Sequence, residues 1–298
     1  MSTLILITLT GLALAAMYFL LAAGLSLIFG LMDVLNFAHG AFFTWGAYAA
    51  WWTIGWLAPG GTAGAGTTGA FLVSLVAAAL AGALLAALVE VVLLRPLYQR
   101  PIYQVLVTLG VGLALSELTA VLWRYDAQRF PQPSWLAATS TLLGARVPNN
   151  RLVLILAAAL VLAGMLVFLR KTRYGLIVRA GAENREMVRA LGIDVNRAFT
   201  LVFALGGALA GLGGVFGAAY FGAIDPHFGS VNLIFAFIVV VIGGLGSIEG
   251  SALAAVIIGL AQQYANYYAA SWVGDFAVVL LLAVVLLVRP RGLLGVAR

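Results

Sequence analysis

The sequence predicts an all-α polytopic membrane protein with eight or nine hydrophobic segments, some of them broken or re-entrant. Of the 298 residues, 64% are hydrophobic and only 9% are charged, and the mean hydropathy is +1.10. A soluble domain carries roughly a quarter charged residues, so an ordinary globular enzyme is excluded. Apolar runs of about 20 residues, long enough to cross a bilayer, recur along the whole chain. We therefore expect residues 1–298 to form a single transmembrane domain.

Some apolar runs are continuous and others are interrupted, and the number of membrane crossings depends on how the interrupted runs are interpreted. Two regions are interrupted, at 36–57 and at 233–268, and the second could hold one segment or two. If 36–57 crosses fully, nine segments cross and the N-terminus is outside. If it is re-entrant, eight cross and the N-terminus is inside, and the sequence leaves both open. The continuous runs lie at 4–29, 70–94, 103–123, 152–169, 198–221 and 275–288.

Basic residues predict the orientation, because cytoplasmic loops of membrane proteins are rich in Arg and Lys. The first 94 residues have neither, and 7 of the chain's 16 basic residues lie within 170–197. We place this segment, the turn at 95–100 and the C-terminus in the cytoplasm. The segment 124–151 then becomes an external loop although it holds four arginines. The net charge of +6 thus reflects topology rather than a nucleic-acid surface.

The cytoplasmic segment 170–197 is predicted to contain a short amphipathic helix from Glu183 to Leu191. Asn184 is a candidate cap at its start, and Gly192 is suited to end it. Glu183 and its charged neighbours would occupy the polar side.

The apolar side of that helix would carry Met187, Val188 and Leu191. Leu191 follows Met187 by four positions and Val188 by three, so these side chains share a face. A helix of nine residues is marginal by itself in water and needs a surface to pack on. That surface could be its own chain, the bilayer, or a groove in a partner protein.

The first interruption, at 33–40, places polar groups within an apolar stretch. A charged group costs about 2.5–3.5 kcal/mol at the centre of a bilayer on insertion scales. The stretch could be a loop at the membrane edge, or an unwound helix whose backbone lines a cavity. Metal ligands at suitable spacing are not evident, so we assign no metal. The candidate pathway residues here are Asn36, Phe37, His39 and Gly40.

The second interruption, at 243–250, has four glycines in eight residues, which disfavours a continuous helix. The glycines could serve tight helix packing or a broken helix beside a solute path. The candidate pathway residues here are Gly244, Gly246 and Ser247. Because the two breaks lie in opposite halves of the chain, we expect them to flank one central path.

The segment 180–193 (AGAENREMVRALGI) resembles the coupling loop of ABC importer permeases. It is most similar to the family for high-affinity uptake of branched-chain (hydrophobic) amino acids. The stretches 36–40 (NFAHG), 243–250 (GGLGSIEG) and 289–295 (RPRGLLG) follow the same family in order, so the resemblance covers nearly the whole chain. Glu249 departs from it, because Pro or a neutral residue is expected there.

The resemblance implies a permease of the bacterial inner (plasma) membrane with several partners. These are a homologous second permease, two ATP-binding subunits and an extracytoplasmic solute-binding protein. The coupling loop would sit on an ATP-binding subunit, and ATP and Mg²⁺ would bind there rather than on this chain. This chain lacks the phosphate-cradling motif of ATPases and is expected to be non-catalytic. Family relatives carry branched-chain or other apolar amino acids, urea, short amides or aromatic acids.

An ion-coupled secondary transporter is the main alternative. It would need carboxylates paired or networked near the middle of the membrane. Glu90 and Glu117 instead lie near the ends of their segments, without an evident midplane partner. A channel would show a repeated filter or charged ring, and a membrane enzyme would show a nucleophilic site; neither is visible. Stimulation by ATP would separate the importer from all three.

Overall fold

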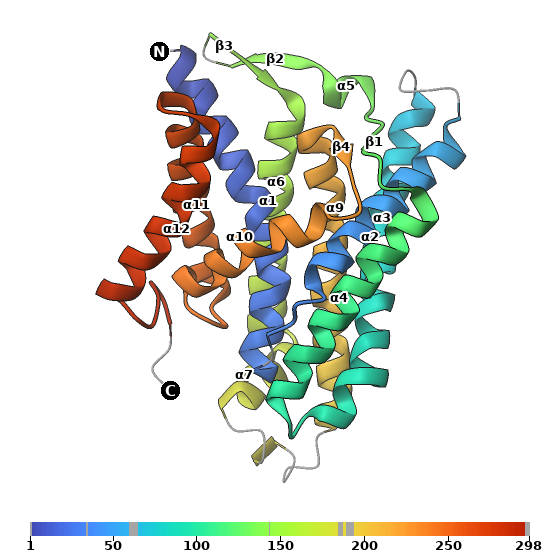
Figure 1. Cartoon of the computed structure of the whole chain (residues 1–298), viewed down its shortest axis with the longest axis vertical. Helices are drawn as coiled ribbons and strands as arrows, with labels where there is room; N and C mark the ends of the chain where they lie inside the picture. Colours follow the sequence, from blue (N-terminus) through green and yellow to red (C-terminus); the bar gives the residue numbers. More distant parts are fainter. Residues whose placement is uncertain are drawn as a thin grey trace.

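The computed structural model describes residues 2–33, 35–59, 65–142, 144–183, 187–188 and 194–295, and most of them are helical (Figure 1). The long helices are α1 (Ser2–Met32), α2 (His39–Leu57), α3 (Ala65–Val89), α4 (Pro101–Trp123), α6 (Asn149–Lys171), α9 (Val195–Phe221), α10 (Phe228–Gly243), α11 (Ile248–Tyr268) and α12 (Ser271–Val288). The short helices are α5 (Ser134–Ala137) and α7 (Arg173–Glu183). A π-helical turn (Glu90–Leu94) and a 3-10 turn (Arg95–Leu97) extend α3.

Two small antiparallel pairs of strands complete the described residues. Strand β1 (Gln128–Arg129) pairs with β4 (Ala223–Ile224). Strand β2 (Thr139–Leu142) pairs with β3 (Ala145–Pro148), with Thr139 opposite Pro148. Both pairs lie at the same end of the helical bundle (Figure 1).

The polytopic all-α architecture predicted from the sequence is confirmed, but the number of spans is lower. Among the described residues, six helices are long and apolar enough to cross a membrane, or up to seven if a bent pair counts as one span. The bent pair is α10 and α11, where the chain direction bends by 118° at the break between them. The expected eight or nine is higher because α10 and α11 form one broken unit, and because α2, rich in tryptophan and glycine, is not among the six.

Helices α1 and α9 are the most buried spans, with 61% of their apolar windows inside the bundle. Glycine makes this packing close. A Cβ atom on Gly207 would lie 2.3 Å from the carbonyl oxygen of Gly82 in α3, and one on Gly211 would lie 2.2 Å from that of Ala78. Contacts between small residues are a common way to associate helices in membranes. Larger side chains at these positions would separate α3 from α9.

The bundle has two chemically distinct ends (Figure 1). We call one the basic end; it comprises the turn at 95–100, α7 and residues 289–295. Arg95 donates to Thr200 at the start of α9 (2.7 Å), and the backbone of Leu293 bonds to Ile242 (2.8 Å). The three basic clusters that we place in the cytoplasm therefore share one end.

We call the other the β end; it comprises the N-terminus, the end of α2 and the two strand pairs. One of the arginines that opposed the topology is accommodated there. The guanidinium carbon of Arg151 lies 3.3 Å from the centre of the Tyr220 ring, and Arg151 donates to the Tyr220 carbonyl at 3.2 Å. Because α1 starts and α2 ends at the β end, the segment 36–57 returns to the end where the chain begins.

Candidate functional site: two helix breaks, two cavities and an amphipathic helix

The first break links the end of α1 to the start of α2. Asp33 takes a left-handed conformation with φ of 53°. Asn36 is fully buried, and its side-chain oxygen accepts a bond from the backbone of Ala38 at 3.1 Å. The buried ring of His39 bonds through Nε2 to the carbonyl oxygen of Leu21 at 3.1 Å. Asn36 and His39 therefore shape the break itself.

Phe37 and Gly40 lie in a different environment. Both line a cavity of about 220 Å³ between α2, α4 and α10, which we call the smaller cavity. The Phe37 and Phe237 rings are 4.8 Å apart. Gly40 also contacts the start of α10, since a Cβ atom on Gly229 would lie 1.8 Å from its carbonyl oxygen. The first break is therefore packed directly against the first turn of α10.

The second break is a tight turn at the basic end. Gly244 and Gly246 have φ angles of 102° and 82°, which side chains rarely adopt. Ser247 caps α11, because its hydroxyl accepts a bond from the backbone of Gly250 at 3.0 Å. A Cβ atom on Gly246 would lie 2.8 Å from the Cα atom of Gly30 in α1.

The C-terminal segment seals this turn. The backbone amides of Leu293 and Leu294 donate to Ile242 (2.8 Å) and Gly243 (3.0 Å). A Cβ atom on Gly244 would lie 2.4 Å from the backbone nitrogen of Gly295. The predicted interruption of the helix is confirmed. The first break contacts the start of α10 through Gly40, and the second break follows the end of that helix.

Glu249, where the resemblance led us to expect Pro or a neutral residue, forms an ion pair. Its Oε1 lies 2.5 Å from a guanidinium nitrogen of Arg170 at the end of α6. Both side chains are largely exposed. The ion pair ties the start of α11 to the helix that leads into α7.

A helix that we did not predict, α7, precedes the expected one at the basic end. Helix α7 spans Arg173–Glu183, and within the expected helix from Glu183 to Leu191 the described residues Met187 and Val188 are helical. Gly175, Val178 and Gly181 are buried on one face, and Leu176 is exposed on the other. Because two of these three buried positions are glycines, the apolar pattern that would predict α7 from the sequence is weak.

The predicted coupling residues are only partly described. Glu183 is the last residue of α7. Met187 and Val188 are helical, with Met187 62% exposed and Val188 3% exposed. Met187 thus presents an apolar side chain at the surface, while Val188 packs inside. Asn184, Leu191 and Gly192 lie outside the described residues.

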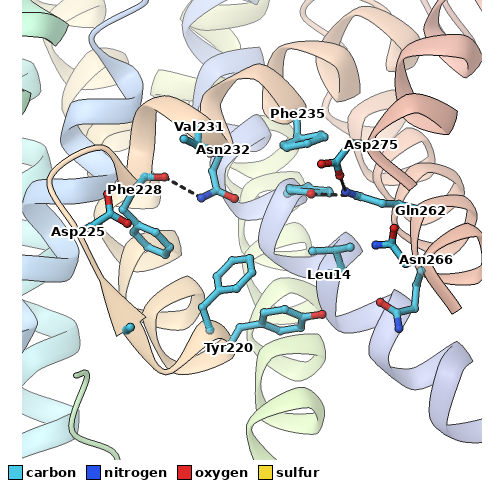
Figure 2. A pocket seen from close by; sticks show the side chains of 14 residues that line it. Leu14, Tyr220, Asp225, Phe228, Val231, Asn232, Phe235, Gln262, Asn266 and Asp275 are labelled. Carbon is cyan, nitrogen blue, oxygen red and sulfur yellow. Dashed lines mark hydrogen bonds between the residues drawn. The ribbon is translucent and has the colours of Figure 1, made fainter. Parts of the chain in front are cut away.

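A cavity of about 460 Å³, which we call the larger cavity, lies between α1, the end of α9, α10, α11 and the start of α12 (Figure 2). It lies towards the β end, where α9 and α11 end and α12 begins. We did not predict it from the sequence. The signal available was the polar series on α11 and α12. The residues that line it are Leu14, Tyr18, Tyr220, Phe221, Ala223, Asp225, Phe228, Val231, Asn232, Phe235, Gln262, Gln263, Asn266 and Asp275.

A chain of hydrogen bonds crosses one wall of the larger cavity. The hydroxyl of Tyr18 donates to Gln262 Oε1 (2.9 Å), and Gln262 Nε2 donates to Asp275 Oδ1 (2.7 Å). The Tyr18 ring is stacked on Phe235, with centroids 5.1 Å apart. Because α1 and α10 both run towards the basic end, this stack forms the wall of the cavity nearer that end.

Glu90 belongs to a separate cluster at the basic end. Its buried carboxylate accepts bonds from Tyr98 and from Thr200 (2.7 Å), and it pairs with Arg95 at 3.3 Å. Glu117 accepts a bond from Tyr125 at the opposite end of α4 (2.5 Å). Each of these two carboxylates bonds to partners at its own end of the bundle. A secondary transporter would instead need paired carboxylates near the membrane midplane.

Long apolar helices around a cavity of mixed polarity, with a glycine-rich break and an amphipathic helix at one end, are typical of a polytopic membrane transport protein. The chain belongs to the family described as the permease component of branched-chain amino acid transport systems, which it matches over residues 7–289. It is thus a multi-pass membrane protein.

Several proteins named as transport permeases are similar to it. The high-affinity branched-chain amino acid permease protein LivH of Salmonella typhimurium is 30% identical over 96% of this chain and 93% of its own length. The corresponding protein BraD of Pseudomonas aeruginosa is 29% identical over 96% of this chain and 94% of its own. The fructose import permease protein FruF of Bifidobacterium longum is 35% identical over 39% of this chain and 34% of its own. No solved structure is significantly similar to the chain.

Proposed function

We propose that the chain is the membrane permease subunit of an ATP-driven importer for branched-chain or other hydrophobic amino acids. The observation that carries this proposal is the family match, which extends over residues 7–289. LivH and BraD, which align along nearly their whole lengths, are named as branched-chain amino acid permeases. The partial likeness to a fructose permease shows that related chains differ in solute, so urea, short amides and aromatic acids remain alternatives for the test.

The proposed complex comprises this chain, a homologous second permease, two ATP-binding subunits and an extracytoplasmic solute-binding protein. ATP and Mg²⁺ would bind the ATP-binding subunits. The basic end, including the C-terminus, would face the cytoplasm of a bacterial cell and the β end would face the binding protein. Accumulating a solute 100-fold costs about 2.7 kcal/mol, and the chain must receive this energy through contact with a motor. The exposed apolar side chain of Met187 supports a contact at the predicted coupling residues.

The test is co-purification with the ATP-binding subunits, using Met187→Asp and the matched control Met187→Leu. A charge at an apolar contact opposes docking, so we expect Met187→Asp to lose the ATP-binding subunits while it still inserts into the membrane. Met187→Leu keeps volume and polarity and should retain them. Adding Leu191→Asp to the first variant should complete the loss.

Uptake into proteoliposomes decides between the importer and the alternative. The intact complex with its binding protein should accumulate L-leucine only when ATP is enclosed. Accumulation driven by an ion gradient, by this chain without ATP-binding subunits, would refute the proposal and favour a secondary transporter.

A further inference from the structure

The charge that lines the larger cavity is of one sign. Asp225 and Asp275 are the charged groups among its described lining residues, and they lie on opposite sides of it (Figure 2). Arg151 is not in the lining, because its guanidinium packs on the ring of Tyr220 and bonds to the carbonyl oxygen of that residue. Two carboxylates without a lining cation favour a positively charged ligand group.

Asp275 is held in place for such a contact. The buried amide of Gln262, only 4% exposed, donates to Oδ1 of Asp275 at 2.7 Å. Tyr18 fixes the amide in turn, by donating to its oxygen at 2.9 Å. These bonds orient the carboxylate and leave Oδ2 for a ligand. An ammonium group has donors only, so it matches a carboxylate oxygen.

The rest of the cavity is mixed in character. The side-chain oxygen of Asn266 accepts a bond from the backbone of Gly274 at 3.0 Å, so its amide N–H groups are left to donate. Leu14, Phe228 and Phe235 supply apolar surface. A charged acceptor, amide donors and apolar walls in one cavity complement an ammonium group, a carboxylate and an apolar side chain.

We propose that the larger cavity binds an apolar α-amino acid in transit, with its ammonium group on Asp275 and its side chain against the apolar wall. This inference rests on the proposed function and deepens it, because it assigns part of the solute recognition to this subunit. Tyr18 and Gln262 are positioning residues for Asp275. Since Tyr18 also stacks on Phe235, the residues that orient the ligand also close the cavity towards the basic end.

The chain contains no cysteine, so one introduced cysteine can report whether the cavity is occupied. Val231 lines the cavity and is 57% exposed. In Val231→Cys, we would measure the rate of maleimide modification of this chain in the purified complex. A second reporter, Phe221→Cys, lines the same cavity and is 53% exposed. Trp56→Cys, at the end of α2 and 73% exposed, is the control.

Three matched probes separate the recognised groups: L-leucine, isoamylamine, which lacks the carboxylate, and 4-methylpentanoate, which lacks the ammonium group. We expect leucine to slow modification at both cavity positions and not at Trp56→Cys. Isoamylamine should protect more weakly, and 4-methylpentanoate should not protect. Asp275→Asn should raise the half-protecting concentration of leucine about tenfold or more, as the loss of a charge-assisted hydrogen bond predicts. The exposed acid Asp126, which is not among the lining residues, gives the control Asp126→Asn, which should change nothing.

Equal protection by 4-methylpentanoate would overturn the inference. So would an unchanged half-protecting concentration in Asp275→Asn, or the absence of protection by leucine at both cavity cysteines. The assay needs neither ATP nor the binding protein. Protection without ATP-driven uptake would therefore refute the proposed function alone, and uptake without protection would refute this inference alone.

Discussion

The two ends of the α10–α11 pair differ sharply, although the same helices form both. At the basic end the helices meet in a glycine turn against which α1 and the C-terminal segment pack without room for a side chain. Towards the β end they diverge around a cavity of about 460 Å³ lined by amides, carboxylates and aromatic rings. The comparison shows that small residues close one end of the pair, whereas at the other end larger side chains, several of them polar, surround a cavity.

The glycine turn at 243–247, together with residues 293–295 that pack against it, is called the seal below. The strongest test of the comparison is to place a side chain in this seal. In Gly244→Val the new Cβ atom would lie 2.4 Å from the Gly295 nitrogen, at a φ of 102°. Overpacking costs about 1–3 kcal/mol, and the left-handed backbone adds about 1–2 kcal/mol. We expect a markedly lower melting temperature in detergent and much aggregated protein. Gly110→Ala, where nothing lies within 4 Å, is the control and should be close to wild type. A stable Gly244→Val variant would show that the seal is not tightly packed.

A smaller effect is expected from opening the cavity wall nearest the seal. Phe235→Ala removes the ring that stacks on Tyr18 at 5.1 Å, a contact worth about 0.5–1.5 kcal/mol beyond burial. The expected result is a several-fold faster leak of L-leucine through ATP-free proteoliposomes, while the protein stays folded. Phe276→Ala, which removes a ring that is 61% exposed on α12, should not leak. An unchanged leak in Phe235→Ala would mean that the seal alone blocks passage.

The smallest effect is expected at the ion pair beside the seal. Arg170 and Glu249 are 63% and 51% exposed, and exposed pairs contribute about 0.2–1 kcal/mol. Glu249→Gln should therefore lower the melting temperature by only a few degrees at most. A double-mutant cycle with Arg170→Gln would measure the coupling between the two side chains. The exchange Arg170→Glu with Glu249→Arg should restore most of the loss. A coupling energy of several kcal/mol would place this pair within the seal rather than beside it.

Part of the candidate site followed from local sequence. The second break was predictable because Gly244 and Gly246 adopt positive φ angles that glycine takes at little cost. The sequence did not predict that the four candidate residues of the first break would lie in two different environments. Asn36 bonds within the break and His39 bonds back to Leu21 in α1, whereas Phe37 and Gly40 line the smaller cavity. Which way a side chain points from an irregular segment depends on the helices around it.

The amphipathic helix shows a different limit. We expected a helix from Glu183 onwards, within which the described Met187 and Val188 are helical, but we did not expect the preceding helix α7 at Arg173–Glu183. Its buried face is made by Gly175, Val178 and Gly181. Two of these are glycines, which carry no apolar side chain and so weaken the pattern that predicts a buried face. Close approach to α6 and α1, rather than hydrophobicity, selects them.

The sequence by itself determined the class of protein, the apolar spans, the basic clusters and the glycine turn. Each of these depends on local composition: a length of apolar chain that matches the bilayer, or a backbone conformation that one residue type permits. Only the tertiary structure decided that α10 and α11 bend into one unit and that α1 and the C-terminal segment seal the turn. It alone brought Tyr18, Gln262 and Asp275 into one hydrogen-bonded wall. Contacts between residues so distant in the chain depend on how whole helices pack, which no local pattern specifies.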